Sequence, residues 1–297
     1  MSRLYITGSQ LQDFERCPEY HRALWLLNRE RIGPENENLL MGTWAHEALA
    51  ILMRWPGTSP VSLPWFGTNA KWQALHLAIQ AWADRYSMDV YRPWTKLIET
   101  ENPLETPLVI DEQVILVSPK PTVLNGGKTV SILGQEVWLL GTPDAWVIRH
   151  GKLWHVQHKT LDQSQSIANF AFKVAQSLHE SIYAILGMAH WPELEYGGTM
   201  LNIIRKISLK RAKESPHEAL HLEFIPITPE QIERAKLDLL YCVRHFHDGW
   251  RRRSACSGPP YGKCPYYEAC WQGASLDDDI LYQTRKSRYP QVHQVEE

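Results

Sequence analysis

Hydrophobic and polar residues alternate along several stretches of this chain, which is the pattern of strands with one buried face. The stretch from 108 to 160 is strand-like throughout and is interrupted by a turn signal, Asn-Gly-Gly, at 125–127. Shorter alternating stretches at 199–209 and 221–227 predict two further strands. The middle of the chain is therefore expected to build a sheet.

Helical spacing of apolar residues, or helix-capping residues, marks the segments that flank these strands. The predicted helices cover residues 38–55, 70–86, 171–189 and 229–251. A capping box at Ser9-Gln-Leu-Gln12 predicts that a first helix starts there, with Leu11 and Phe14 facing inward. This order of helices and strands predicts an α/β core with a helical N-terminal lobe.

The composition of the 297 residues is that of an ordinary soluble globular protein, with 44% hydrophobic and 22% charged residues. We expect one domain over residues 1–297, made of a helical lobe (1–100), a sheet core (101–228) and a C-terminal segment (229–297). Because no apolar stretch has transmembrane length, we expect no membrane association and a cytoplasmic location. With a net charge of −2, binding to nucleic acid has to rely on local patches of charge.

The most informative part of the sheet region is a predicted hairpin formed by the runs 136–148 and 152–160. If His150-Gly151 is the centre of a tight turn, opposite residues are equidistant from it, which places Asp144 opposite Gln157. Strand periodicity then puts Lys159 on the same face as Gln157. An acidic residue, an amide oxygen and an ammonium group are thus expected on one patch of the sheet.

These residue types suit metal-assisted attack on a phosphodiester. Asp144 and the side-chain carbonyl of Gln157 offer hard oxygen ligands for a divalent cation, which lowers the pKa of a bound water. Lys159 could hold the attacking water or stabilise the negative charge that develops on the phosphoryl oxygens. The alternative is an ordinary hairpin whose polar residues face the solvent, because motifs this short also occur by chance.

Several other short motifs accompany the hairpin in a definite order along the chain. The full set is Cys17 within Ser-Gln-Leu-Gln-Asp-Phe-Glu-Arg-Cys-Pro, Gly42-Thr-Trp-Ala-His46, Pro143-Asp144, Gln157-His158-Lys159, His179-Glu-Ser-Ile-Tyr183, and Cys256, Cys264 and Cys270. In type and order these motifs resemble the PD-(D/E)XK nuclease superfamily, specifically its RecB-like branch with an iron–sulfur cluster. The resemblance implies a restriction-endonuclease-like α/β fold, with a mixed central sheet flanked by helices, over the whole chain.

The resemblance also implies a role for each matching residue. His46 and Asp144 would bind Mg²⁺ or Mn²⁺, with Gln157 as a weaker oxygen ligand. Asp144, Gln157 and Lys159 would form the catalytic group. The substrate would be DNA, as single strands or ends.

Two residues depart from the family's pattern. Gln157 stands where the family has Asp or Glu, which removes one negative charge and should weaken metal binding, although an amide oxygen can still coordinate. His179 stands where the family usually has Gln; with Tyr183 it would contact the substrate. Glu112, in the strand-like run 108–117, could restore a carboxylate if that strand lies beside the hairpin.

Five cysteines, an odd number, favour metal ligands over a set of disulfides. Cys17 with Cys256, Cys264 and Cys270 could supply four thiolates, which suit either an iron–sulfur cluster or zinc. Their spacing does not distinguish the two metals, but residues 264–271, Cys-Pro-Tyr-Tyr-Glu-Ala-Cys-Trp, resemble the family's cluster segment and imply 4Fe–4S. The alternative is buried cysteines without a metal, and Cys242 is expected to be a plain core residue.

Taken with the resemblance, the site predicts a metal-dependent DNA nuclease, an exonuclease of RecB-like type acting in DNA recombination, repair or end processing. One alternative is an iron–sulfur relative that binds DNA without cleaving it, because Gln157 has replaced the carboxylate. A second is a zinc metalloprotease, because His217-Glu218-Ala-Leu-His221 matches H-E-x-x-H. That motif requires a helix, and Pro216 with the strand-like run 222–227 leaves little room for one.

Overall fold

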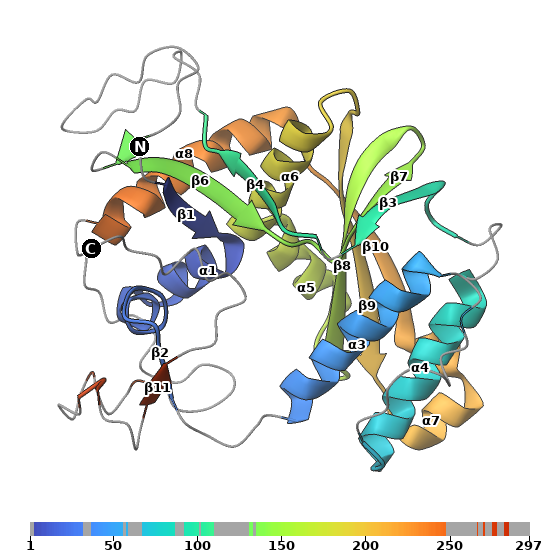
Figure 1. The fold of residues 1–297 in the computed structure, drawn as a ribbon. Coiled ribbons are helices and arrows are strands. Elements are labelled where there is room, and N and C mark those ends of the chain that lie inside the picture. The colour runs from blue at the N-terminus through green and yellow to red at the C-terminus, as the bar shows by residue number, and fades with distance from the viewer. Residues whose placement is uncertain are drawn as a thin grey trace. The chain divides into compact units, whose positions relative to one another are not determined.

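Two compact units make up the chain in the computed structural model, and each contains a mixed sheet accompanied by helices (Figure 1). The predicted α/β class is therefore confirmed. The structure describes residues 3–31, 37–55, 58, 67–86, 92–100, 102–109, 131–132, 135–247, 266, 270, 275–277 and 282–284. The units are Met1–Pro34 with Glu105–Gly141 and Glu230–Glu297, and Glu35–Leu104 with Thr142–Pro229. Each unit is thus assembled from separated segments, and the prediction that they act as one nuclease domain stays a prediction.

The sheet of the first unit is built around β6 (Gln135–Gly141). β6 pairs in parallel with β1 (Arg3–Thr7), antiparallel with β5 (Ser131–Ile132), and also neighbours β4 (Leu104–Pro107). The helical elements of this unit are α1 (Gly8–Arg16), α2 (Pro18–His21), the π-helical turn η1 (Arg22–Leu26) and α8 (Pro229–His247). A short antiparallel ladder joins β2 (Arg29–Arg31) to β11 (Tyr282–Thr284), so the N-terminal and C-terminal segments of this unit lie side by side.

The first helix begins earlier than predicted. Thr7 is the N-cap of α1: its side chain accepts a hydrogen bond from the Gln10 amide (3.2 Å), and the Gln10 side chain accepts one from the Thr7 amide (3.3 Å). The predicted box starting at Ser9 is two residues too late, because both segments match the same Ser/Thr-x-x-Gln pattern. Leu11 and Phe14 are buried as predicted.

The second unit has a five-stranded sheet with strand order β10-β9-β8-β7-β3. Its strands are β3 (Lys96–Thr100), β7 (Ala145–Arg149), β8 (Lys152–Asp162), β9 (Tyr196–Lys206) and β10 (Leu220–Pro226). Among the pairs of described strands in this sheet, only β8–β9 is parallel, which makes the sheet mixed, as predicted. A parallel pair needs a crossover connection, and α5 (Ile167–Ala175) with α6 (Leu178–His190) provides it.

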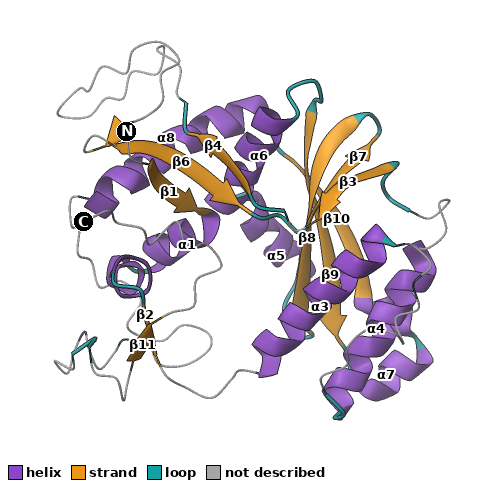
Figure 2. Cartoon of the chain, in the orientation of Figure 1, coloured by secondary structure: helices purple, strands orange, loops and turns teal. Residues whose placement is uncertain are grey.

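Helices lie on both faces of this five-stranded sheet (Figure 2). Val156 of β8 belongs to the core cluster with α3 (Glu37–Arg54) and α4 (Ala70–Tyr86). Leu161 of β8 belongs to a second cluster with Val174 of α5. Because side chains alternate along a strand, even-numbered β8 residues face α3 and α4, and odd-numbered residues face α5 and α6.

The predicted helices 38–55 and 70–86 are confirmed as α3 and α4. The predicted helix 171–189 is wrong as a single element: the chain breaks after α5, and Ser177 caps a new helix, α6. None of the helices that the structure describes is long and apolar enough to span a membrane.

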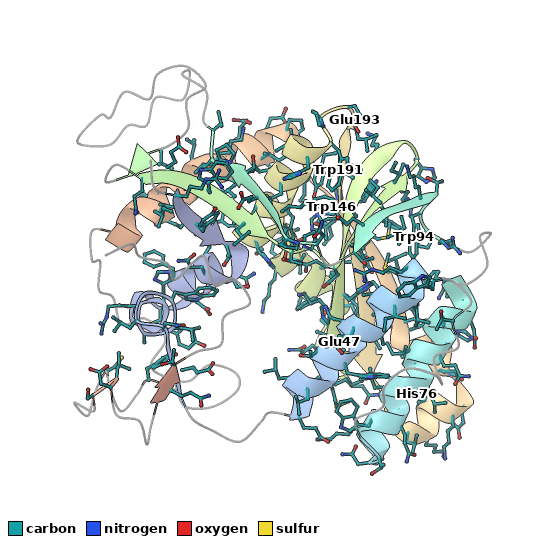
Figure 3. The ribbon with its side chains drawn as sticks, viewed as in Figure 1. Glu47, His76, Trp94, Trp146, Trp191 and Glu193 are labelled. Carbon is teal, nitrogen blue, oxygen red and sulfur yellow. The ribbon has the colours of Figure 1, made fainter. Side chains whose placement is uncertain are left out.

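Tryptophan side chains hold α6 close to the sheet. Trp146 of β7 lies against Trp191, the residue after α6, with ring centroids 5.1 Å apart (Figure 3). A Cβ atom at Gly187 of α6 would overlap the Trp146 ring. The absence of a side chain there lets α6 approach β7, which matters for the polar residues that α6 carries.

Gly198 of β9 is expected to contribute strongly to the stability of this unit. Its φ of 136° is a conformation that other residues rarely adopt, and a Cβ atom there would overlap the Ile225 carbonyl oxygen of β10. We expect Gly198→Ala to lower the free energy of unfolding by about 3 kcal/mol, measured by chemical denaturation. Gly151→Ala is the matched control: φ is 76°, but a Cβ atom meets nothing within 4 Å, so the loss should be only about 1 kcal/mol.

Candidate active site

The predicted hairpin is present with the predicted register. β7 and β8 pair antiparallel from Ala145 opposite Val156 to Arg149 opposite Lys152. The turn between them, His150-Gly151, has positive φ at both residues, 48° and 76°, as a tight two-residue hairpin turn requires. Extending this register by one residue places Asp144, just before β7, level with Gln157.

Asp144 immediately precedes β7, so at this level β8 has no paired residue of β7 beside it. One carboxylate oxygen accepts a hydrogen bond from the backbone amide of His158 (2.6 Å), so the side chain substitutes for a missing strand neighbour. The other oxygen lies 2.8 Å from Nδ1 of His46. His46 comes from α3, one turn after Gly42, and the two side chains are 26% and 14% exposed. The structure therefore brings together the histidine and the aspartate singled out in the sequence, at a point that solvent can reach.

The electrostatic environment keeps Asp144 ionised. Burial by itself would raise the pKa of this carboxyl group, but the attraction and hydrogen bond of His46 lower it, as does the positive charge of Lys159. The net effect is a pKa well below the ordinary value for aspartate. A carboxylate that stays charged in a partly buried position is suited to binding a cation.

His158 is held in one tautomer from the α4 side. The indole nitrogen of Trp82 donates to Oδ1 of Asn202 (3.2 Å), so the Asn202 amide nitrogen faces Nδ1 of His158 (2.8 Å) and donates to it. Burial lowers the pKa of His158 to about 4, which leaves the ring neutral near pH 7. Because His158 is even-numbered, its ring points away from the face that carries Gln157 and Lys159.

Gln157 and Lys159 share the face of β8 that is turned toward α5 and α6, as predicted. Gln157 is only 3% exposed, whereas Lys159 is half-buried. The positive charge of Lys159 lowers the pKa of Asp144 and also contributes to lowering that of His179. The positive charge of Lys159 is therefore felt both at Asp144 and at His179.

His179 and Tyr183 lie one turn apart on α6 and contact each other, with 3.0 Å between Nε2 and the phenol oxygen. The Tyr183 hydroxyl donates to the carbonyl oxygen of Thr142 (3.2 Å), so the His179 Nε2 hydrogen must be the donor in the first contact. Burial lowers the pKa of His179 to about 4. Tyr183 thus holds the segment just before Asp144, a contact that the sequence motif did not reveal. The predicted contact of both residues with substrate stays a prediction.

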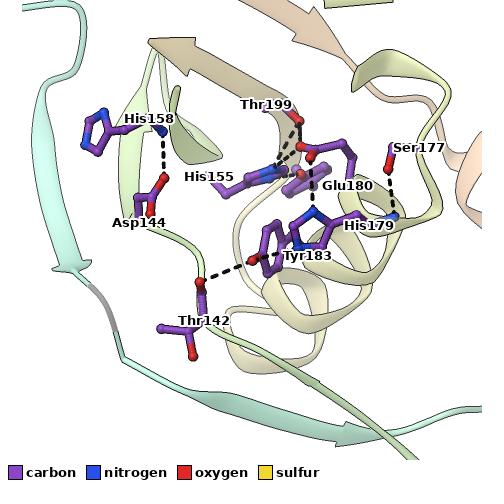
Figure 4. A network of polar contacts seen from close by, with 10 residues as sticks. Thr142, Asp144, His155, His158, Ser177, His179, Glu180, Tyr183 and Thr199 are labelled. Atoms are coloured by element: carbon purple, nitrogen blue, oxygen red, sulfur yellow. Dashed lines mark hydrogen bonds and ion pairs between the residues drawn. The ribbon is translucent and has the colours of Figure 1, made fainter. Parts of the chain in front are cut away.

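Glu180 and His155 are two buried polar residues that the sequence analysis missed. Nε2 of His155 donates to a Glu180 carboxylate oxygen (2.7 Å), and the Thr199 hydroxyl donates to the same oxygen (2.8 Å). Their positions relative to Asp144 and Tyr183 are visible in Figure 4. The only sequence signal was Glu180 itself, three residues after Ser177, which matches a local capping box and does not predict a partner on β8.

The Asp144 oxygen and the His46 nitrogen could together bind a divalent cation that takes few of its ligands from the protein. Nδ1 of His46 and the nearer Asp144 oxygen are 2.8 Å apart, close to the separation of about 3 Å between neighbouring ligands on one such cation. His46 approaches Asp144 from the side of the His158 ring, whereas Gln157 lies on the opposite face of β8, so its role as a further oxygen ligand stays a prediction. In the part of the chain that the structure describes, no three His, Cys, Asp or Glu side chains are grouped to hold a metal ion. A cation here would keep several water ligands.

The other residues singled out in the sequence fall into three groups. Glu112, Cys256 and Cys264 lie outside the described residues. Cys17, at the end of α1, is buried, and Cys270 packs against the cluster that contains Trp25; both belong to the first unit. Cys242 is buried in α8, as predicted.

The metalloprotease motif does not have the conformation that it needs. His217 and Glu218 lie in a 3-10 turn, η4 (Pro216–Ala219), and His221 lies on β10. The turn follows α7 (Leu209–Glu214), which ends before the motif. Without an α-helix, the two histidines are not placed one turn apart on a common helical face, as expected from Pro216.

No protein-family model and no curated protein matches the chain. Among solved structures, the chain is similar to the crystal structure of a "Putative exonuclease" from Eubacterium rectale, with 10% sequence identity and a TM-score of 0.46. The match covers 98% of this chain and 94% of the other. At this level of identity and overlap, the similarity by itself indicates neither a shared family nor a shared activity.

Proposed function

We propose that this chain is a metal-dependent deoxyribonuclease of RecB-like type, an exonuclease that hydrolyses phosphodiesters in single strands or ends of DNA. The observation that carries the proposal is the contact between an ionised Asp144 and the His46 imidazole just before the start of β7, under the influence of the positive charge of Lys159. A helix and a hairpin, distant from each other along the chain, thus supply a carboxylate and an imidazole to one partly exposed point. We place the activity in DNA recombination, repair or end processing, by resemblance to the RecB-like branch.

Each residue has a distinct task in this mechanism. His46 and Asp144 would hold Mg²⁺ or Mn²⁺, with Gln157 as a further oxygen ligand. A cation bound there would lower the pKa of a coordinated water and offset charge on the scissile phosphate. Lys159 orients the attacking water and stabilises the charge of the pentacovalent transition state. By the resemblance, His179 and Tyr183 of α6 would contact the DNA backbone.

The direct test is degradation of labelled single-stranded DNA by the full chain, with and without Mn²⁺. We expect shortening of the DNA in Mn²⁺ and none after chelation with EDTA, because the cation is needed to activate the water. A closed circular single strand, which has no ends, should survive if the enzyme is an exonuclease. Metal-independent cleavage would reject the proposal.

Gln157→Glu is expected to increase both Mn²⁺ affinity and the rate of cleavage. The added carboxylate restores a second negative ligand, and we expect binding about tenfold tighter, measured by calorimetry. Gln163→Glu is the matched control, because Gln163 is exposed just beyond β8 and should leave affinity unchanged. Equal affinity in wild type and Gln157→Glu would remove residue 157 from the ligand set.

A second candidate function is DNA binding without cleavage. The observation that favours it is Gln157, which is neutral, 3% exposed and leaves Asp144 as the single carboxylate among the assigned ligands. This candidate predicts a shift of labelled DNA in gel electrophoresis with no turnover in Mn²⁺. Cleavage that appears only in Gln157→Glu would establish it.

The proposal includes a 4Fe–4S cluster on Cys17, Cys256, Cys264 and Cys270, with zinc as the alternative metal. Support comes from the first unit, where Cys270 packs against the cluster containing Trp25, and the β2–β11 ladder joins the same two ends of the chain. Four thiolates from both ends would close a long loop and stabilise the unit. Anaerobically purified protein should be brown and contain about four iron atoms per chain. Colourless protein with one zinc would exclude the cluster.

A further inference from the structure

Glu180 is a buried carboxylate that the proposed mechanism does not use. It is 2% exposed and lies in the first turn of α6, beside His179. A buried charge is costly unless it is compensated by hydrogen bonds. Here the compensation comes from two different strands, His155 on β8 and Thr199 on β9, as Figure 4 shows. The Glu180 side chain therefore fixes the start of α6 to the centre of the sheet.

Both ring nitrogens of His155 form hydrogen bonds. Nε2 donates to Glu180 (2.7 Å), and Nδ1 accepts from the Tyr196 hydroxyl (2.5 Å). The ring also packs edge-on against Tyr183, with centroids 5.1 Å apart. With 0% exposure, His155 has one orientation available, and Glu180 is correspondingly confined.

This buried pair is connected to the candidate active site through one helical turn. Tyr183 lies three residues after Glu180 on α6, and its hydroxyl donates to the Thr142 carbonyl oxygen. Thr142 is two residues before Asp144, whose carboxylate accepts from the His158 amide. The position of α6 thus sets where the Tyr183 hydroxyl lies, and the Tyr183 hydroxyl limits where the Asp144 segment can move.

We propose that Glu180 and His155 form a buried brace that positions Asp144 through Tyr183 and Thr142. Glu180 is a positioning residue in this scheme. Its side chain contacts His155 and Thr199 in the protein interior and acts on the Asp144 carboxylate only through Tyr183 and Thr142. Its importance for catalysis rests on the proposed function, but the brace itself is a property of the fold. The brace can therefore be tested without metal or DNA.

The test is hydrogen exchange of the His158 backbone amide in the full chain, followed by NMR. That amide is bonded to the Asp144 side chain, so its exchange reports whether Asp144 is in place. Glu180→Ala should accelerate its exchange about tenfold, and Tyr183→Phe should do the same. The double variant should exchange about as fast as either single variant, because both changes break one chain of contacts.

The amide of Ile203 in β9 is the internal control, since it lies in the middle of the sheet, opposite Lys159 and His221. Its exchange should be unchanged relative to wild type. If Glu180 only supported the fold as a whole, Glu180→Ala would accelerate the exchange of the His158 and Ile203 amides equally, which would overturn the brace. Additive effects of the two substitutions in the double variant would also overturn it.

Glu180→Gln covers the case in which the alanine variant does not fold. Glutamine keeps an acceptor oxygen for His155 and Thr199, so His158 exchange should stay within about twofold of wild type. A tenfold acceleration in Glu180→Gln would show that the charge, and not the hydrogen-bonded shape, is what matters, and would overturn the brace as stated. A chain that cleaves no DNA but shows the predicted exchange pattern would refute the nuclease proposal and leave the brace intact.

Discussion

Asp144→Asn should abolish metal-dependent DNA cleavage, with a loss of about a thousandfold, or ~4 kcal/mol of transition-state stabilisation. The substitution keeps the size of the side chain but removes the negative charge that His46 and Lys159 stabilise. Mn²⁺ affinity should fall with activity, because the only carboxylate among the assigned ligands is gone. Rates on labelled single-stranded DNA and calorimetric Mn²⁺ titrations measure the two effects.

Asp162→Asn is the matched control for this prediction. Asp162 is the last residue of β8, is half exposed and pairs with Lys206 at 3.4 Å. Its substitution should leave both cleavage and Mn²⁺ binding unchanged, since an exposed ion pair contributes little. An Asp144→Asn enzyme that is as active as this control would remove Asp144 from the active site.

Lys159→Met should reduce cleavage by about a hundredfold to a thousandfold while leaving Mn²⁺ binding intact. The ammonium group is assigned to the attacking water and the transition-state charge, and loss of one such donor typically has this cost. Methionine retains most of the apolar stem of the half-buried side chain, so the fold should be preserved. The expected signature is a lower kcat with little change in KM for DNA.

Lys206→Met is the control for the loss of a lysine. Lys206 ends β9, neighbouring Asp162 of β8, and contacts Asn38 and Asp162. Activity close to wild type is expected. If Lys159→Met lost Mn²⁺ binding together with activity, the lysine would have a structural role at the metal site, and its catalytic assignment would be wrong.

The hairpin was predictable because its determinants are local. A two-residue turn at His150-Gly151 with positive φ at both positions leaves only one register for the flanking strands. Strand alternation then placed Gln157 and Lys159 on one face. The helices α3 and α4 were predictable for the same reason, because apolar spacing marks the face that each one buries.

Predictions failed where a tertiary contact overrode a local pattern. The run 136–148 alternates like one strand, yet it forms β6 in the first unit and β7 in the second, with the break at Thr142-Pro143-Asp144. The apolar spacing of 171–189 likewise continues across Ser177, where the chain starts a new helix. In both cases the hydrophobic pattern is the same on either side of the break, so it cannot mark which neighbour each part packs against.

By itself, the sequence determined the hairpin, its register and the chemical types available on it, because these depend on residues a few positions apart. Only the tertiary structure decided three contacts: His46 with Asp144, the Asp144 carboxylate with the His158 backbone amide, and Glu180 with His155. The physical reason is that buried polar groups must find partners wherever the fold provides them. Those partners lie on other helices and strands, at separations along the chain that no local pattern records.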